Sequence, residues 1–196
     1  MQPLRFVPPD FRVPPVSPQA IEFLAWQLRQ IVGQSGLAPL CSFGVVAAMR
    51  AQPGPTRDVD IRHVADGRLG MEGCLTLDPP VIWLEARVYT DAERGGPLGR
   101  DVVLHELAHL ILHAEPLRQF HADAYVPPEA TTYTAGCEWQ AIRLSTAFAM
   151  PPAVVERARD ARALARISGM PFKRASYRFA RYRGHADRDP RQFRLF

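Results

Sequence analysis

Residues 101 to 113, DVVLHELAHLILH, hold three of the six histidines of the chain. At 100° per residue, the apolar side chains of this segment fall on one arc of a helix, and the ionisable side chains fall in the remaining wedge. One side of such a helix is buried while the other lines a cleft. The polar wedge contains His105, Glu106, His109 and His113. The segment therefore predicts an active-site helix.

The flanking residues predict where this helix begins and ends. Asp101 suits the N-terminal end, because a carboxylate there interacts favourably with the helix dipole. Pro116 is expected to stop the helix soon after Ala114, since the residue before a proline is disfavoured in helical conformation.

Two of the histidines have the spacing of metal ligands. His105 and His109 are four residues apart, so a helix projects both imidazoles from one face with about 6 Å of rise between them. His113 lies another turn along, about 12 Å of rise from His105, too far to share an ion with both across bonds of about 2.1 Å. We interpret His113 as a neighbouring or packed histidine. Glu115 is a poor candidate, because a chain reversal would need a glycine where Leu112 stands.

A catalytic zinc ion usually takes three protein ligands and keeps a position for water. Glu138 begins a second amphipathic helical segment, EWQAIRLSTAFAMP, and a glutamate from a helix packed on the first is a plausible third ligand. The alternative is a first-turn glutamate that only favours the helix dipole. Spacing alone does not choose between the two.

These two segments together resemble the ImmA/IrrE family of metallopeptidases, in which an HExxH helix is followed by a Glu-x-x-Ala helix that ends in Met-Pro. The residues at the family's spacing are Glu138, Ala141, Met150 and Pro151. The resemblance covers about residues 60 to 183 and is strong in the two helices. It departs at Ile142 and Leu144, where family members commonly carry Asn and Phe.

The resemblance implies a zinc-dependent endopeptidase in which Zn2+ is bound by His105, His109 and Glu138, and Glu106 is the catalytic base. Zinc with these ligands can lower the pKa of a bound water to about 7. The donor that stabilises the oxyanion stays open among His121, Tyr125 and Tyr133, all in the segment between the two helices. The implied substrate is a helix-turn-helix transcriptional repressor in a stress, phage or mobile-element response.

We expect an α+β fold, with a zincin-like small β-sheet packed on the HExxH helix and a helix-turn-helix-like segment after it. A helix from Ser17 to about Gly33 is expected to cover the sheet. Short β-branched or aromatic runs predict strands in CSFGVVAAMR (41–50), GCLTLD (73–78) and VIWLEARVYT (81–90), with AQPGPTRD (51–58) as a loop. The run 81–90 is expected to present its edge to an extended substrate.

Four regions are expected along the chain. Residues 1–16 form a proline-rich arm, extended along the surface if it packs at all, and order is expected to begin near Ser17. Residues 17–151 form the zinc metallopeptidase domain. Residues 152–183 form two helices joined by a turn at 169–171, and residues 184–196 form a basic tail.

The basic charge of the chain lies at its C-terminal end. Residues 152–196 contain 12 Arg or Lys against 4 Asp or Glu, whereas residues 1–151 contain 12 against 16. This surface is either simply solvated or contacts nucleic acid or an acidic partner. The candidate contacts are Lys173, Arg174, Arg178 and Arg181. The alternative is that these helices complete the peptidase core.

No apolar run approaches the roughly 20 residues that span a bilayer, so we expect a cytoplasmic protein with no membrane partner. The three cysteines are far apart and form no CxxC pair. Two alternatives to the peptidase remain: a DNA-binding or protein-binding regulator whose metal site is not catalytic, and one component of a toxin–antitoxin pair.

Overall fold

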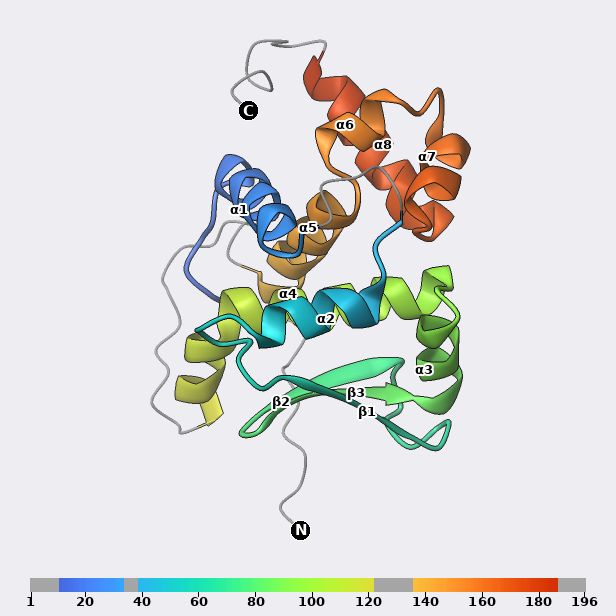
Figure 1. The fold of residues 1–196 in the computed structure, drawn as a ribbon. Coiled ribbons are helices and arrows are strands. Elements are labelled where there is room, and N and C mark those ends of the chain that lie inside the picture. The colour runs from blue at the N-terminus through green and yellow to red at the C-terminus, as the bar shows by residue number, and fades with distance from the viewer. Residues whose placement is uncertain (1–10, 34–38, 122–135, 187–196) are drawn as a thin grey trace.

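The computed structural model describes residues 11–33, 39–121 and 136–186, and within them the side chains of 116–121 and 184–186 are left out. This part of the chain has eight helices and one three-stranded mixed sheet, as an α+β fold requires (Figure 1). The helices are α1 (Pro18–Ile31), α2 (Ser42–Arg50), α3 (Ala86–Glu93), α4 (Pro97–His121), α5 (Cys137–Ala149), α6 (Pro152–Glu156), α7 (Ala161–Ser168) and α8 (Phe172–Ala186). The strands are β1 (Asp60–Val64), β2 (Gly73–Leu77) and β3 (Pro80–Glu85).

The sheet has the strand order β1-β3-β2, in which β3 pairs in parallel with β1 and antiparallel with β2. The predicted strand at 73–78 is confirmed. The prediction for 81–90 is wrong in two respects: the strand ends at Glu85, where α3 begins, and β3 is the central strand. An edge for an extended ligand is therefore offered by β1 or β2.

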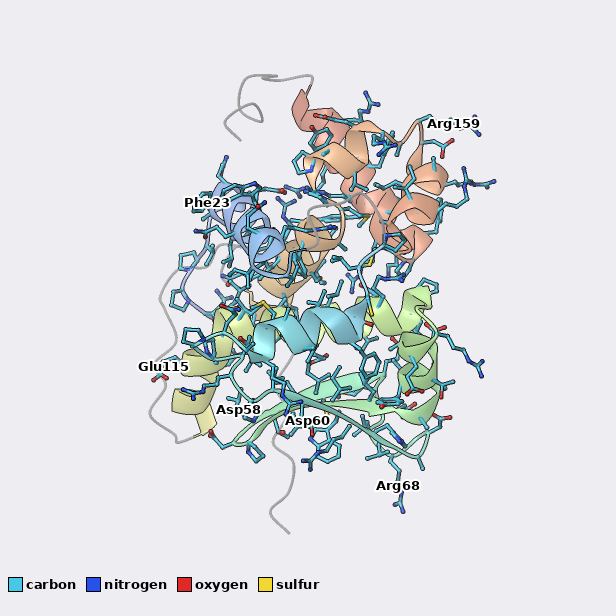
Figure 2. All side chains as sticks on the ribbon, in the orientation of Figure 1. Phe23, Asp58, Asp60, Arg68, Glu115 and Arg159 are labelled. Carbon is cyan, nitrogen blue, oxygen red and sulfur yellow. The ribbon has the colours of Figure 1, made fainter. Side chains whose placement is uncertain are left out.

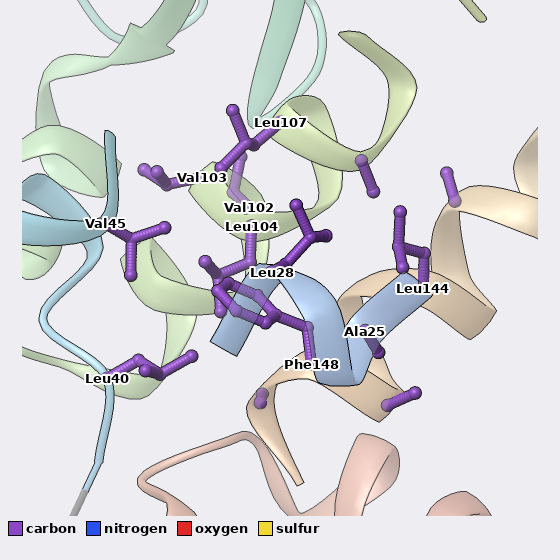
Figure 3. Close-up of a cluster of buried hydrophobic side chains, with 14 of the residues drawn as sticks. Ala25, Leu28, Leu40, Val45, Val102, Val103, Leu104, Leu107, Leu144 and Phe148 are labelled. Atoms are coloured by element: carbon purple, nitrogen blue, oxygen red, sulfur yellow. The ribbon is translucent and has the colours of Figure 1, made fainter. Parts of the chain in front are cut away.

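Helix α4 is the central element of the molecule and lies between the sheet and the layer formed by α1 and α5 (Figure 1). Its apolar residues contact both layers, because apolar side chains surround most of its circumference. Figure 3 shows Val103, Leu104 and Leu107 of α4 in the same cluster as Leu28 of α1 and Phe148 of α5. The arc predicted to be apolar is the face that is buried in this cluster.

The close approach of β2 to α4 depends on Gly73. A Cβ atom at this position would lie 2.6 Å from Cγ1 of Val102 and 3.0 Å from Cδ2 of Leu84. A side chain at this position would force Val102 to shift, so glycine lets the first residue of β2 pack directly on α4.

Both predicted ends of the HExxH helix are wrong. The helix begins at Pro97, as proline is tolerated in a first turn, and it continues through Pro116 to His121. Asp101 lies in the second turn, where its carboxylate pairs with the guanidinium of Arg174 at 2.9 and 3.0 Å. Local start and stop signals are weaker here than the packing that the helix gains from layers on both sides.

The segment 41–50 is helix α2 and not a strand. Its buried residues are Ser42, Val45, Val46 and Met49, which are the i, i+3, i+4 and i+7 positions of a helix. The β-branched pair favours strand locally, but the spacing of the whole segment buries one helical face. The loop predicted at 51–58 is confirmed by the turns that follow α2.

The prediction of α1 is confirmed in its limits and wrong in its partner. Ser17 is the N-cap, and its hydroxyl accepts a hydrogen bond from the backbone N–H of Ala20 at 3.1 Å. The helix packs on α5 and does not cover the sheet (Figure 1).

The N-terminal segment that precedes α1 runs along the surface and buries two of its side chains in the core. Phe11 is 5% exposed and Val13 is 1% exposed. The carbonyl of Phe11 accepts a hydrogen bond from the backbone N–H of Cys137 at 3.0 Å, and Arg12 forms an isolated antiparallel bridge with Gly136. The expectation that order begins near Ser17 is therefore wrong for residues 11–16. The extended course along the surface is as expected, since Arg12, Pro14 and Pro15 are exposed, and residues 1–10 lie outside the described residues.

The C-terminal region has three helices where the sequence predicts two. Asp160 divides the first predicted helix, because its carboxylate accepts from the backbone N–H of Ala163 at 2.7 Å and caps α7. The predicted turn at 169–171 is confirmed, with Gly169 in the left-handed conformation at φ 64°.

Two buried arginines fix the C-terminal end of α5. The guanidinium of Arg29 donates to the carbonyls of Phe148 and Ala149 at 2.6 and 2.8 Å. Arg178 donates through Nε to the carbonyl of Met150 at 2.9 Å, and its terminal nitrogens bind the carboxylate of Glu22. These carbonyls have no partner further along the helix, so cations there satisfy them and complement the helix dipole.

None of the helices in the described part of the chain combines the length and the apolar character needed to cross a membrane.

We expect Arg178→Met to lower the free energy of unfolding by about 3 kcal/mol, because it removes the donor that binds the Glu22 carboxylate and the Met150 carbonyl. Lys173→Met is the matched control: it makes the same loss of charge at an exposed position of α8 and should change stability by no more than about 0.5 kcal/mol. Urea unfolding of both variants measures the difference. Equal effects would contradict a stabilising role for Arg178.

Candidate metal centre

The predicted ligands meet where α4 packs on α5. Nε2 of His105 lies 3.2 Å from Oε2 of Glu138, and Nε2 of His109 lies 3.1 Å from Oε1 of the same carboxylate. The two Nε2 atoms are 3.1 Å apart. Each residue thus offers one ligand atom to a common point. Two interpretations of Glu138 were open: a third ligand from a second helix, or a first-turn glutamate that only favours the helix dipole. The structure favours the first, since the carboxylate faces the two imidazoles.

The geometry fits a small divalent cation. Two ligands of a tetrahedral ion, each at about 2.0 to 2.1 Å, are about 3.3 Å apart, close to the separations of these three atoms. Two imidazole nitrogens and one carboxylate oxygen are also ligands that zinc accepts. Without a cation, both Nε2 atoms must carry hydrogens to bind the carboxylate, and the two donors then face each other at 3.1 Å. A cation at the meeting point removes that conflict.

The cluster is buried on one side and open on the other. The side chain of His109 is 4% exposed and that of His105 is 16% exposed, whereas that of Glu138 is 37% exposed. A small pocket opens here and is lined by Met71, Gly73, Cys74, Leu75, Glu106, His109 and Glu138. A ligand bound in this pocket would contact the candidate base and two of the candidate metal ligands at once.

The charges of the cluster stabilise one another. Burial by itself would raise the pKa of Glu138, but hydrogen bonds from His105 and His109 hold it far below its ordinary value. Burial would lower the pKa of His105, yet the bond to Glu138 and the charges of Glu106 and Glu138 raise it. The carboxylate is therefore ionised at neutral pH and available as a ligand.

The side chain of Glu106 lines the same pocket and is less exposed to solvent than that of Glu138. The residue is only 9% exposed, and burial raises its pKa above the ordinary value, although the neighbouring imidazoles act against this. A carboxylate with a raised pKa accepts a proton more readily near neutral pH, which is the property of a general base.

The other candidates from the sequence are placed as follows. His113 is buried beside His109 as a packed neighbour, and burial together with the charge of His109 lowers its pKa to about 4. Glu115 is exposed and projects outward (Figure 2). His121 is the last residue of α4, and its side chain is not described. Tyr125 and Tyr133 lie outside the described residues.

The four candidate nucleic-acid or partner contacts are not equivalent. Arg178 is 5% exposed and binds Glu22, and Arg174 binds Asp101. Arg181 is half-buried and donates to the hydroxyl of Tyr177 at 3.3 Å. Among the four, Lys173 is the exposed one. Arg174 and Arg178 therefore hold the fold together and do not offer free charge to a phosphate.

Sequence reasoning missed two parts of the site. One is the strand β2, which was expected only as part of the sheet but contributes Gly73, Cys74 and Leu75 to the pocket. The other is Gln140, a buried amide bonded to His113. The sequence offers one indication of Gln140: it is a polar residue, two positions after Glu138, on a side of this helical segment that is otherwise apolar.

No model of a known protein family matches this chain, and no curated protein matches it either.

We expect Glu138→Ala to lose stoichiometric zinc, because two imidazoles alone leave a candidate ion without its anionic ligand. Elemental analysis of the purified variant beside the unmodified protein measures this. Glu115→Ala, an exposed position on α4, is the control and should keep the zinc content of the unmodified protein. Full zinc occupancy in Glu138→Ala would mean that the third ligand is misassigned.

Proposed function

We propose that this chain is a zinc-dependent endopeptidase of the ImmA/IrrE type, which cleaves a helix-turn-helix transcriptional repressor. One observation carries the reaction class: three ligand atoms converge in a pocket that also contains a buried glutamate next in sequence to the first ligand. The repressor as substrate rests on the sequence resemblance alone.

His105, His109 and Glu138 would hold the zinc ion. When bound, such an ion polarises a carbonyl and lowers the pKa of water to about 7. The pocket on the open side of the cluster leaves room for a substrate carbonyl, since the carboxylate of Glu138 is 37% exposed there.

Glu106 performs the proton transfers of the proposed reaction. It projects from α4 into the pocket and cannot point where both histidines do, so it faces the reacting groups and not the ligand atoms. Its carboxylate takes the proton of the attacking water and later gives that proton to the leaving amine nitrogen. Burial raises the pKa of this carboxylate, which favours its acceptance of a proton.

Strand β2 supports an extended peptide as the substrate. It is an edge strand of the sheet, and three of its five residues line the pocket. A peptide that adds to this edge would form backbone hydrogen bonds whatever its sequence, and side-chain pockets would then supply the selectivity. Met71, which is 45% exposed at the same pocket, is positioned to contact a substrate side chain.

We expect Glu106→Gln to keep its zinc and to cleave at least about 100-fold more slowly, because the amide cannot accept the proton of water. The protein is first tested on purified helix-turn-helix repressors, and the substrate that it cleaves is then used for the variants. Glu115→Gln, the same change on the exposed side of α4, should cleave at the original rate. Undiminished cleavage by Glu106→Gln would refute the role of this residue.

A second candidate function is duplex DNA binding through the C-terminal helices. The observation that favours it is the set of exposed cations on and around α7: Arg157, Arg159, Arg162, Arg166 and Lys173. Figure 2 shows Arg159 projecting from the molecule at this end. Phosphate contacts by such side chains give salt-dependent binding without base recognition.

For this candidate, the double variant Arg162→Glu, Arg166→Glu should weaken duplex affinity at low salt more than about 10-fold and reduce the slope of log K against log salt by about 2. Arg57→Glu, Arg68→Glu makes the same change at two exposed positions, of which Arg68 projects from the opposite end of the molecule (Figure 2), and should leave affinity nearly unchanged. Fluorescence anisotropy of a labelled duplex measures both. No binding by the unmodified protein at low salt removes the candidate.

A further inference from the structure

A row of buried hydrogen bonds begins at His109, on the ring nitrogen that faces away from the candidate ion. Nδ1 of His109 lies 3.3 Å from Nδ1 of His113. Nε2 of His113 lies 3.0 Å from the amide oxygen of Gln140, and the amide nitrogen of Gln140 donates to the carbonyl of Pro14 at 2.9 Å. The row thus joins α4, α5 and the segment before α1.

The direction of every bond in this row follows from one condition. If Nε2 of His109 binds a metal, the neutral ring carries its hydrogen on Nδ1 and donates it. His113 must then accept at Nδ1 and carry its own hydrogen on Nε2. That hydrogen is donated to the amide oxygen of Gln140, whose NH2 group is left to donate to a backbone carbonyl. No bond in the row joins two donors or two acceptors.

The row is closed to water. His109 is 3% exposed, and His113 and Gln140 are 1% exposed each. A polar group buried this deeply costs free energy unless its partner is present, so the arrangement of lowest free energy is the fully paired one. The pairing leaves a single tautomer for each ring.

The far end of the row is itself held by backbone contacts. The carbonyl of Phe11 accepts from Cys137 at 3.0 Å, and Arg12 pairs with Gly136. These contacts lie at the residues just before Glu138. The segment 11–14 therefore supports the first turn of α5 and also ends the row at Pro14.

We propose that His113 and Gln140 are positioning residues that hold His109 with Nε2 directed at the metal and Nδ1 protonated. This inference rests on the metal centre proposed above. Its effect is on the affinity for metal, because a ligand ring that is already oriented loses less entropy on binding and its basicity rises when its N–H is accepted.

The decisive test is the pair His113→Asn and His113→Leu. Asn and Leu have the same number of side-chain heavy atoms with the same branching, and the amide oxygen of Asn lies at the branch position that Nδ1 occupies in histidine. His113→Leu should bind zinc at least about 10-fold more weakly than the unmodified protein, whereas His113→Asn should recover most of that loss. Competition with a chromophoric chelator measures the affinity, and the absorption spectrum of bound Co2+ reports on ligand geometry.

Stability measured on the metal-free variants separates positioning from packing. Packing alone predicts that Leu is the better buried residue, so His113→Leu should be the more stable of the two towards urea. Positioning predicts the opposite order for zinc affinity. Equal zinc affinity in the two variants, or tighter binding by His113→Leu, overturns the proposal.

Gln140→Leu tests the next bond of the row. It leaves the His109 and His113 contact in place but removes the acceptor that fixes the His113 tautomer. We expect a smaller, few-fold loss of zinc affinity, and an affinity equal to that of the unmodified protein would remove Gln140 from the proposal. Because these readouts are metal affinities, a protein that binds zinc but cleaves no repressor refutes the proposed function without affecting this inference. A protein that binds no zinc refutes both.

Discussion

Two imidazoles and a carboxylate meet where α4 crosses α5, and most of the structure serves to keep them there. Each imidazole lies within 3.2 Å of one oxygen of the Glu138 carboxylate, and His109 has almost no access to water. The crossing in turn depends on apolar packing: α4 carries apolar residues around most of its surface, so it can be covered by the sheet on one side and by α1 and α5 on the other.

Helix α5, which carries Glu138, is restrained at both of its ends. At the N-terminal end the segment 11–14 bonds to the residues before Glu138, and at the C-terminal end Arg29 and Arg178 bind the last carbonyls. A helix held in this way cannot slide along its axis without breaking buried hydrogen bonds. The position of Glu138 is therefore set by contacts that lie well away from the ligand atoms.

The residues of the site that could be predicted are those identified by their spacing along a single helix. His105 and His109 at i and i+4 on an amphipathic helix already imply one face and one ligand pair. The distance of His113 from His105 along the same helix excludes it as a third ligand. The partner helix of α1, the helical state of 41–50 and the continuation of α4 beyond Pro116 could not be predicted, because each is decided by packing against distant residues. Gln140 is of the same kind: its role exists only once α5 lies beside His113.

The ion pair between Arg174 and Asp101 ties the last helix to the helix that carries the histidines. Asp101 lies one helical turn before His105, and its partner comes from α8, as does the arginine that binds Glu22. Replacement of α8 by an unrelated segment would leave the carboxylates of Asp101 and Glu22 without these partners, unless the new segment also supplied a cation to each. Helix α8 therefore belongs to the same folding unit as the helix that carries the histidines.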